Sequence, residues 1–408
     1  KRPIKGPLLK ERICTKLRQW EDGTVECEEL AEMSMCVTAQ HNLDYFGPAV
    51  VCTGKKGECE VIEGGEGANN TDLVLYVTTE NMDACESSIA QGGACTVDPE
   101  TLRPDTGFMN ICPTRLDAYD WSVQADRDHL VNIITHEMLH TLVMSPVLFK
   151  HFVDDDGVVR GESQVKETYE KSNGDQVSRI ITPRVVAAGQ AQLECNSLTG
   201  VELESTGSDI TAGSHWENQV FGHEIMNGHL ARNQVHVISN LTLGILADSG
   251  WYSPKFEMAS YVRYGKDAGC GFAELECSDP NIDAGLVSPW FCSAPMTSTQ
   301  AMGGDVKAMC TADYSSAGWC STTRAGCRRV QPFANMVCTD TTLRDVENPA
   351  AGAEWGQMYG PTSRCIGDGS VDWTKKEVIA GRTYQLTYPP TGAGCYGVRC
   401  ETRGDEVK

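Results

Sequence analysis

The sequence predicts an α+β protein, because strand-like segments come first and one long helix-like segment follows them. Residues 72–79 (DLVLYVTT) form an almost unbroken β-branched and aromatic run, which indicates a strand buried on both faces. Residues 91–97 and 107–113 are weaker strand candidates, and the helix-like segment follows at about 126–142. A third observation, the uneven spacing of the cysteines, divides the chain into parts.

Length and composition indicate a folded protein with more than one domain. The chain has 408 residues, which is too long for one ordinary compact core, and its hydrophobic content of 40% is ordinary for a globular protein. The formal net charge is −22, from 34 basic and 56 acidic residues, and no run of Lys or Arg is long enough to follow a phosphate backbone. We therefore expect no nucleic-acid partner.

The cysteines indicate an oxidising compartment and suggest domain boundaries. Nineteen cysteines are far above cytosolic usage, and no Cys-x-x-Cys pair occurs, so the spacing of zinc ribbons is missing. Eight cysteines precede the middle of the chain and ten follow it, with only Cys195 between them. We predict a braced N-terminal domain at 1–145, a central domain at 146–259, and a C-terminal domain at 260–408 held by bridges more than by a large core.

Other signals agree with an extracellular protein, either secreted or on the cell surface. Two N-glycosylation sequons make Asn69 and Asn240 glycosylation candidates. No stretch approaches the roughly 18 apolar residues of a membrane span, and the first residues lack the apolar core of a signal peptide. We interpret the chain as a mature ectodomain from which any signal peptide, propeptide or membrane anchor has been removed, and we expect a monomer.

The predicted helix separates apolar from polar side chains. It begins near Asp126 or Asp128, either of which could cap it, and ends near Leu142. We expect burial of the apolar side, which consists of Val131, Ile134, Met138 and Leu142. The opposite side carries histidines and should face a cleft. His129 shares this side but lies about 10 Å along the axis from His136, so we expect it to have a hydrogen-bonding or surface role.

Residues 136–140 (HEMLH) match the pattern HExxH. Histidines four residues apart lie on the same side of a helix, so His136 and His140 can bind one metal ion at roughly 2.0–2.1 Å. Glu137 lies about 100° further round the helix. From there its carboxylate can act as general base on a metal-bound water. The motif therefore predicts one catalytic Zn²⁺ with His136 and His140 as ligands and Glu137 as the catalytic residue.

A catalytic zinc usually has three protein ligands, so a third must come from elsewhere in the chain. His215 has distinctive surroundings, because residues 211–214 predict a flexible turn before it and Trp216 can anchor its backbone. Eleven residues after His215, Met226 lies in a turn-like segment, 224–228. The downstream histidines are all candidates: His151, His215, His223, His229 and His236.

Three longer segments resemble the leishmanolysin family of zinc metallopeptidases, within the metzincins. They are ITHEMLHTLVMSPVLFKHF (134–152), GSHWENQVFGHEIMNG (213–228) and SNLTLGILADSGWY (239–252). The resemblance extends over residues 70–280 and continues more loosely beyond. It implies a metzincin-like peptidase with a twisted mixed sheet and an active-site helix, with His215 as third zinc ligand and Met226 as the Met-turn residue. It also implies a disulfide between Cys195 and Cys270.

One position departs from the family pattern. Metzincins generally have glycine three residues after the second histidine, where the chain turns out of the helix, and this chain has Val143. A β-branched residue disfavours positive φ, so either the helix continues further or the turn is made differently. If the third ligand were a glutamate, as in thermolysin-like enzymes, Glu217 or Glu224 would be nearest.

The resemblance implies hydrolysis of internal peptide bonds in protein substrates by a zinc-bound water that Glu137 activates. It also implies that substrate lies along an exposed edge strand, for which residues 92–97 are the candidate. Two other functions stay open: a catalytically silent surface adhesin of the same fold, and a zinc amidase that acts on another substrate.

Overall fold

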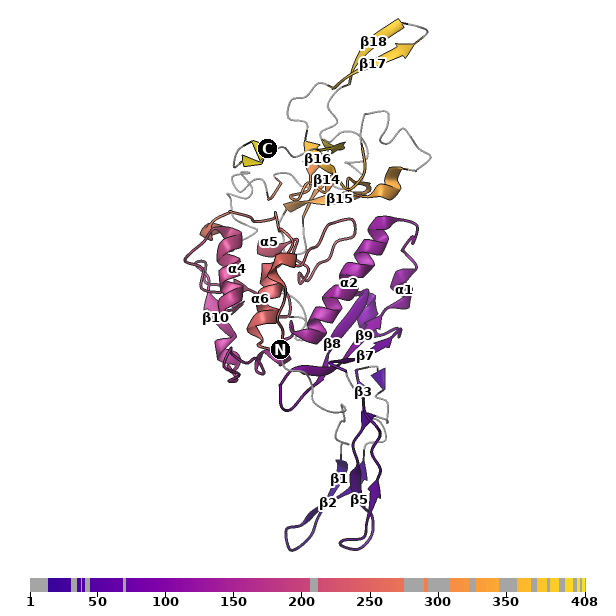
Figure 1. Cartoon of the computed structure of the whole chain (residues 1–408), viewed down its shortest axis with the longest axis vertical. Helices are drawn as coiled ribbons and strands as arrows, with labels where there is room; N and C mark the ends of the chain where they lie inside the picture. Colours follow the sequence, from indigo (N-terminus) through magenta and orange to yellow (C-terminus); the bar gives the residue numbers. More distant parts are fainter. Residues whose placement is uncertain are drawn as a thin grey trace. The chain divides into compact units, whose positions relative to one another are not determined.

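A computed structural model describes most of the chain (Figure 1). The described residues are 14–30, 35–37, 39–40, 45–68, 71–205, 212–274, 290–292, 309–322, 328–344, 358–367, 373–379, 382–388, 393–398, 402–403 and 406–407. They form a mixture of helices and sheets braced by disulfides, which confirms the α+β class. Within these ranges, no helix is both long enough and apolar enough to cross a bilayer.

The chain divides into two compact units, each built from three segments. The first unit contains Lys1–Ala118, Ile134–Lys166 and Ile245–Pro254. The second contains Tyr119–Ile133, Glu167–Gly244 and Lys255–Lys408. The three domain ranges taken from the cysteine spacing stay a prediction.

The first unit is built around a mixed three-stranded sheet with the order β7-β9-β8. Strand β9 (Pro104–Ile111) is central and almost entirely buried, β7 (Val74–Thr78) runs parallel to it, and β8 (Ala90–Val97) runs antiparallel. All three predicted strands are therefore present. The expected burial of 72–79 on both faces is wrong, because β7 is an edge strand of the described sheet and Val77 is 58% exposed.

Helix α2 (Gln124–Leu142) packs against this sheet at glycines. A Cβ atom at Gly92 would lie 2.6 Å from the main-chain oxygen of Glu137, and one at Gly107 would lie 2.2 Å from Cγ2 of Thr141. The close approach buries the side of the helix that carries Glu137 and Thr141. The side predicted to be buried is buried only in part, because Val131 is 61% exposed whereas Ile134, Met138 and Leu142 are half-buried.

Disulfides fix the margins of the first unit. Cys85–Cys112 joins the 3₁₀ helix η2 to the end of β9, and Cys36–Cys95 ties β3 to β8. Two hairpins are also bridged internally, by Cys14–Cys27 and Cys52–Cys59. The further elements of this unit are β1 (Cys14–Gln19), β2 (Val25–Leu30), β3 (Met35–Cys36), β4 (Ala39–Gln40), β5 (Ala49–Cys52), β6 (Cys59–Ile62), η2 (Asp83–Glu86), α1 (Pro113–Leu116), α3 (Pro146–Phe149) and η3 (Glu162–Gln164).

The second unit begins with a three-stranded sheet of order β10-β11-β12 and helix α4. The Cys195–Cys270 disulfide that the family resemblance implied is present, and it joins the segment after α4 to α7. The elements are β10 (Lys166–Glu170), β11 (Gln176–Ile180), α4 (Pro183–Leu193), β12 (Val201–Glu202), α5 (Asn218–Phe221), α6 (Asn240–Asp248, which continues into the first unit), η4 (Phe256–Met258) and α7 (Cys270–Ala273).

The cysteine-rich end of the second unit consists of small sheets. Its buried cluster contains Cys338, Cys365 and Cys395 with only a few other side chains, so bridges supply much of its core. The disulfides there are Cys292–Cys320, Cys310–Cys365 and Cys338–Cys395. The elements are β13 (Met309–Cys310), β14 (Ser316–Thr322), β15 (Arg328–Val337), η5 (Thr341–Arg344), β16 (Ser363–Gly367), β17 (Trp373–Ile379), β18 (Arg382–Tyr388), β19 (Ala393–Gly397), β20 (Thr402–Arg403) and β21 (Glu406–Val407).

Candidate metal centre

His136 and His140 lie one turn apart on α2, and their imidazoles converge. The two Nε2 atoms are 2.9 Å apart, and the rings meet edge to face. Both side chains are buried. This is the arrangement that the four-residue spacing predicts for a helix.

The end of α2 orients His140. The helix ends at Leu142, and the N–H groups of Val143 and Met144 both donate to the Leu139 carbonyl, at 2.9 and 2.8 Å. The Met144 carbonyl then lies 2.7 Å from Nδ1 of His140. A neutral imidazole that donates from Nδ1 presents a lone pair at Nε2, which is the state a metal ligand needs.

The same geometry explains how the chain leaves the helix without glycine. Val143 is fully buried and does not adopt a positive φ. The backbone turns with the Met144 N–H bound to a carbonyl five residues back, and neither Val143 nor Met144 adopts a positive φ. The sequence left open whether the helix continues further or the chain turns in a different way. The helix ends at Leu142, so the second alternative is the one found.

Glu137 lies on the buried side of α2 and is only 9% exposed. Burial raises the pKa of its carboxyl to about 8, and a hydrogen bond from the Gly92 backbone acts in the opposite direction. Because Gly92 has no side chain, the edge strand β8 can approach Glu137 this closely.

His215 lies in a small ladder of backbone hydrogen bonds in the second unit. On one side, the Glu204 N–H donates to the His215 carbonyl at 2.9 Å. On the other side, the N–H of Trp216 donates to the Met226 carbonyl at 2.8 Å. Trp216 is fully buried and its indole N–H donates to Thr242 at 3.2 Å, so it anchors this segment as expected.

The carboxylate of Glu204 lies beside the His215 ring. Its Oε2 lies 3.1 Å from Nδ1 of His215. A Cβ at residue 228 would lie 1.9 Å from the same oxygen, so Gly228 provides the space that the carboxylate occupies. Carboxylates near Nδ1 are common outer partners of metal-binding histidines, where they hold the ring and increase the basicity of Nε2.

Glu224 holds the segment around Met226. Its fully buried carboxylate accepts hydrogen bonds from the N–H of Met226 at 2.7 Å and from the N–H and hydroxyl of Ser239 at 3.1 and 2.9 Å. Met226 is also fully buried. Glu217 is engaged elsewhere, because it caps α5 by accepting from the N–H of Gln219 at 2.9 Å. The two glutamates that were alternative third ligands therefore have other partners.

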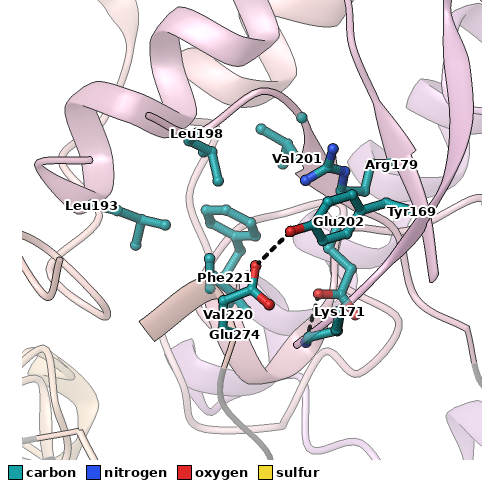
Figure 2. Close-up of a pocket in the computed structure, with 12 residues that line it drawn as sticks. Tyr169, Lys171, Arg179, Leu193, Leu198, Val201, Glu202, Val220, Phe221 and Glu274 are labelled. Atoms are coloured by element: carbon teal, nitrogen blue, oxygen red, sulfur yellow. Dashed lines mark hydrogen bonds and ion pairs between the residues drawn. The ribbon is translucent and has the colours of Figure 1, made fainter. Parts of the chain in front are cut away.

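A buried ion pair supports the strand that leads to Glu204. The Lys171 ammonium lies 3.0 Å from Glu202 at the end of β12, in a pocket shown in Figure 2. The Arg179 guanidinium lies over the ring of Tyr169 in the same pocket. Burial raises the pKa of Glu202 to about 7, and the Lys171 charge opposes this change.

His136, His140 and His215 form a group of three buried side chains whose ligand atoms all lie within 4.8 Å of one another. Three imidazoles are a donor set that suits zinc and leaves a coordination position open. The group could therefore hold a metal ion. It does not include the other downstream candidates in the part of the chain that the structure describes: His151, His223, His229 and His236.

Other residues singled out from the sequence have clear positions. His129 has a hydrogen-bonding role, because its ring nitrogens lie 2.7 Å from the Tyr119 hydroxyl and 3.0 Å from the Leu230 carbonyl. Asn240 is exposed at the first residue of α6. Asn69 lies outside the described residues.

Sequence reasoning missed Glu204, and it placed Gly92 on the candidate substrate edge without predicting its contact with Glu137. A pair of glycines inside a predicted strand is a signal for close backbone approach and could have identified Gly92. Glu204 has no comparable local signal, because it precedes His215 by eleven residues and is one of many acidic residues.

Comparisons with known proteins agree with these observations. The family model for leishmanolysin peptidases matches residues 51–326. The chain is 29% identical to a leishmanolysin-like peptidase of Drosophila melanogaster over 93% of this chain and 58% of that protein. It is 25% identical to that of Drosophila pseudoobscura pseudoobscura over 98% and 67%, and 32% identical to a leishmanolysin homolog of Crithidia fasciculata over 53% and 30%. The chain thus spans about half to two thirds of the length of the leishmanolysin-like peptidases that it matches.

Proposed function

The chain belongs to the leishmanolysin family of metallopeptidases, and from that premise we propose that it is a secreted or cell-surface zinc-dependent endopeptidase. The observation that carries the proposal is the group of three buried histidines, two of which flank Glu137 in HExxH. His136, His140 and His215 would hold one zinc ion. Zinc bound there would lower the pKa of a water molecule and polarise a substrate carbonyl.

Glu137 is the general base and acid of the proposed reaction. Its carboxylate takes a proton from the attacking water, whose oxygen bonds to the scissile carbonyl carbon. It then gives that proton to the leaving amine nitrogen as the C–N bond breaks. Burial raises the pKa of this carboxyl, and a group that both takes and gives a proton works best with a pKa near the working pH.

Strand β8 is the proposed docking edge for substrate. It lies at one edge of the described sheet, and an extended peptide can add to such an edge through main-chain hydrogen bonds. Gly92 and Gly93 keep the strand free of bulky side chains next to Glu137, and the Cys36–Cys95 disulfide fixes its far end. We assign Met226 as the Met-turn residue, because its carbonyl binds the backbone next to His215.

The proposed location rests on the disulfides. Eight bridges among the described residues are typical of proteins that fold in an oxidising compartment. Asn240 is an exposed candidate for a glycan. Peptide mapping with and without glycosidase would identify a glycan at that asparagine.

The mechanism is tested by comparing three variants of the purified protein in a casein-cleavage assay with parallel zinc analysis. We expect Glu137→Ala to keep one zinc per chain and to lose activity by roughly 10²–10⁴-fold, because a general base contributes about that factor. His215→Ala should lose zinc as well as activity. His151→Ala removes a histidine outside the group and should behave like wild type.

Each alternative function predicts a different result. Near-normal cleavage by Glu137→Ala would contradict the mechanism. A wild-type chain that binds zinc but cleaves no protein would favour the adhesin. Mapping of the cleaved bonds separates a peptidase from an amidase.

A further inference from the structure

The N-terminus of α2 is capped by residues more than 200 positions further along the chain. The Gln124 N–H donates to the Thr342 hydroxyl at 3.3 Å, and the Ala125 N–H donates to Oδ2 of Asp340 at 3.2 Å. The first amides of a helix have no partner within the helix, so acceptors from outside must satisfy them. Here both acceptors come from the cysteine-rich end of the second unit.

The contact is reciprocal. The side-chain oxygen of Gln124 accepts from the N–H and the hydroxyl of Thr341, at 3.2 and 2.8 Å. The backbone of Gln124 thus binds a side chain of segment 340–342, and the side chain of Gln124 binds the backbone of that segment. A capping box makes the same reciprocal pair within one helix. This pattern fixes direction as well as distance.

The capping carboxylate is itself held rigidly. Asp340 is 3% exposed, and its Oδ1 accepts from the N–H and the hydroxyl of Thr342 at 2.7 and 2.5 Å. Two residues earlier, Cys338 is bridged to Cys395 and its N–H donates to the Ser315 carbonyl at 2.8 Å. Because the turn is braced, the position of Asp340 can determine that of the helix.

Electrostatics favour the same contact. The N-terminus of a helix carries a partial positive charge, so a carboxylate beside it is stabilising. Water and salt screen this interaction little, because Asp340 is buried.

A second, independent tether holds the same end of α2. The Arg232 guanidinium pairs with both carboxylate oxygens of Asp126 in the first turn. Asp126 also accepts from the Asp120 N–H at 2.7 Å. This tether should keep the helix folded when the Asp340 contact is removed.

We propose that Asp340 and Thr342 are positioning residues of the active-site helix. The cysteine-rich end of the chain holds the start of α2, and through the rigid helix it sets the place of His136 and Glu137, about 18 Å further along. The catalytic consequence rests on the proposed peptidase function. Misplacement of a reacting group by about 1 Å can lower the rate of the catalysed reaction by a large factor, so a change at the cap should lower kcat.

The proposal is tested on the full chain by amide hydrogen exchange and steady-state kinetics together. We expect Asp340→Ala to speed exchange at residues 124–126 about fivefold, the factor that corresponds to a typical cap. It should lower kcat by about threefold to tenfold with little change in KM, because geometry at the reacting centre is altered and substrate binding is not.

Two more variants and a control sharpen the test. Asp340→Asn keeps an oxygen acceptor, so its exchange rate at residues 124–126 and its kcat should both be close to those of wild type. Thr342→Val should speed exchange at residue 124 more than at residue 125, because it removes the acceptor of the Gln124 N–H. Asp156→Ala removes an exposed carboxylate in a turn and should change neither measurement.

Unchanged exchange at residues 124–126 in Asp340→Ala would overturn the cap. Faster exchange with an unaltered kcat would overturn the positioning role. A loss of kcat that Asp340→Asn does not recover would also contradict it. If the wild-type chain has no peptidase activity, the proposed function fails and the positioning role fails with it, while the exchange measurement still decides whether Asp340 holds the helix.

Discussion

The segment 136–140 and the segment 204–239 place their histidines by different means. Helical periodicity brings His136 and His140 together, and one carbonyl, that of Met144, orients the second ring. His215 depends instead on a ladder of backbone bonds and on two carboxylates, Glu204 and Glu224. The first arrangement lies within the nine consecutive residues 136–144, whereas the second is a network of distant residues, so the two should respond differently to mutation.

The largest expected effect is in the network. Glu224→Ala leaves the N–H groups of Met226 and Ser239 and the Ser239 hydroxyl without their buried acceptor. We expect a loss of about 3 kcal/mol or more in the free energy of unfolding, because each unsatisfied buried group costs about 1–3 kcal/mol. Denaturant unfolding measures this loss. Glu224→Gln keeps one acceptor oxygen and should lose less, and equal losses would contradict the network.

Glu204 should affect metal binding more than folding. Glu204→Ala removes the carboxylate beside Nδ1 of His215. Zinc affinity should fall about 10–100-fold, as it typically does when an outer partner of a metal-binding histidine is lost. Competition with a chelator measures the affinity. Unchanged zinc affinity would show that the ladder alone orients His215.

The helix segment is most sensitive where it meets the sheet. Gly92→Ala places a Cβ 2.6 Å from the Glu137 main-chain oxygen, so the helix or the strand must move. We expect a cost of about 1–3 kcal/mol in stability, as for other overpacked sites, together with reduced kcat. Gly93→Ala is the matched control, because its Cβ would meet the edge of the Phe108 ring at 3.0 Å. A ring can shift slightly, so the control should lose less.

The smallest effect expected is a pH dependence in the network segment. Burial lowers the pKa of His236 to about 3, below the ordinary value of 6.5. As the pH falls, this histidine is protonated near pH 6.5 in the unfolded chain but stays neutral in the folded chain. Protonation therefore favours the unfolded chain, and the stability present above pH 6.5 is lost. Between pH 7 and pH 6 this histidine should account for about 0.7 kcal/mol. The free energy of unfolding at both pH values measures it, and a His236→Phe variant with the same difference as wild type would contradict the assignment.

Local patterns predicted the elements of the site better than their surroundings. The HExxH spacing located two converging histidines, and the three strands are where their β-branched or small residues indicated. Neither Asp126 nor Asp128 caps α2 through its own side chain, because the acceptors come from Asp340 and Thr342. No local pattern contains a partner that distant.

Burial was the other failure of local reasoning. An apolar stripe on a helix usually faces the core, yet Val131 is exposed and the histidine side is buried. The sheet packs against the side of α2 that carries Glu137 and Thr141, where Gly92 and Gly107 allow close approach. His215 was separated from four other histidines mainly by family resemblance, since its place in the ladder depends on contacts that spacing does not encode.

The exit from α2 also bears on how related chains are recognised. A search pattern that requires glycine three residues after the second histidine would reject this chain, which has Val143 there. The Met144 carbonyl nevertheless reaches His140, because a bond to a carbonyl five residues back bends the backbone. A pattern that permits a buried aliphatic residue at this corner would find sequences that the glycine rule discards.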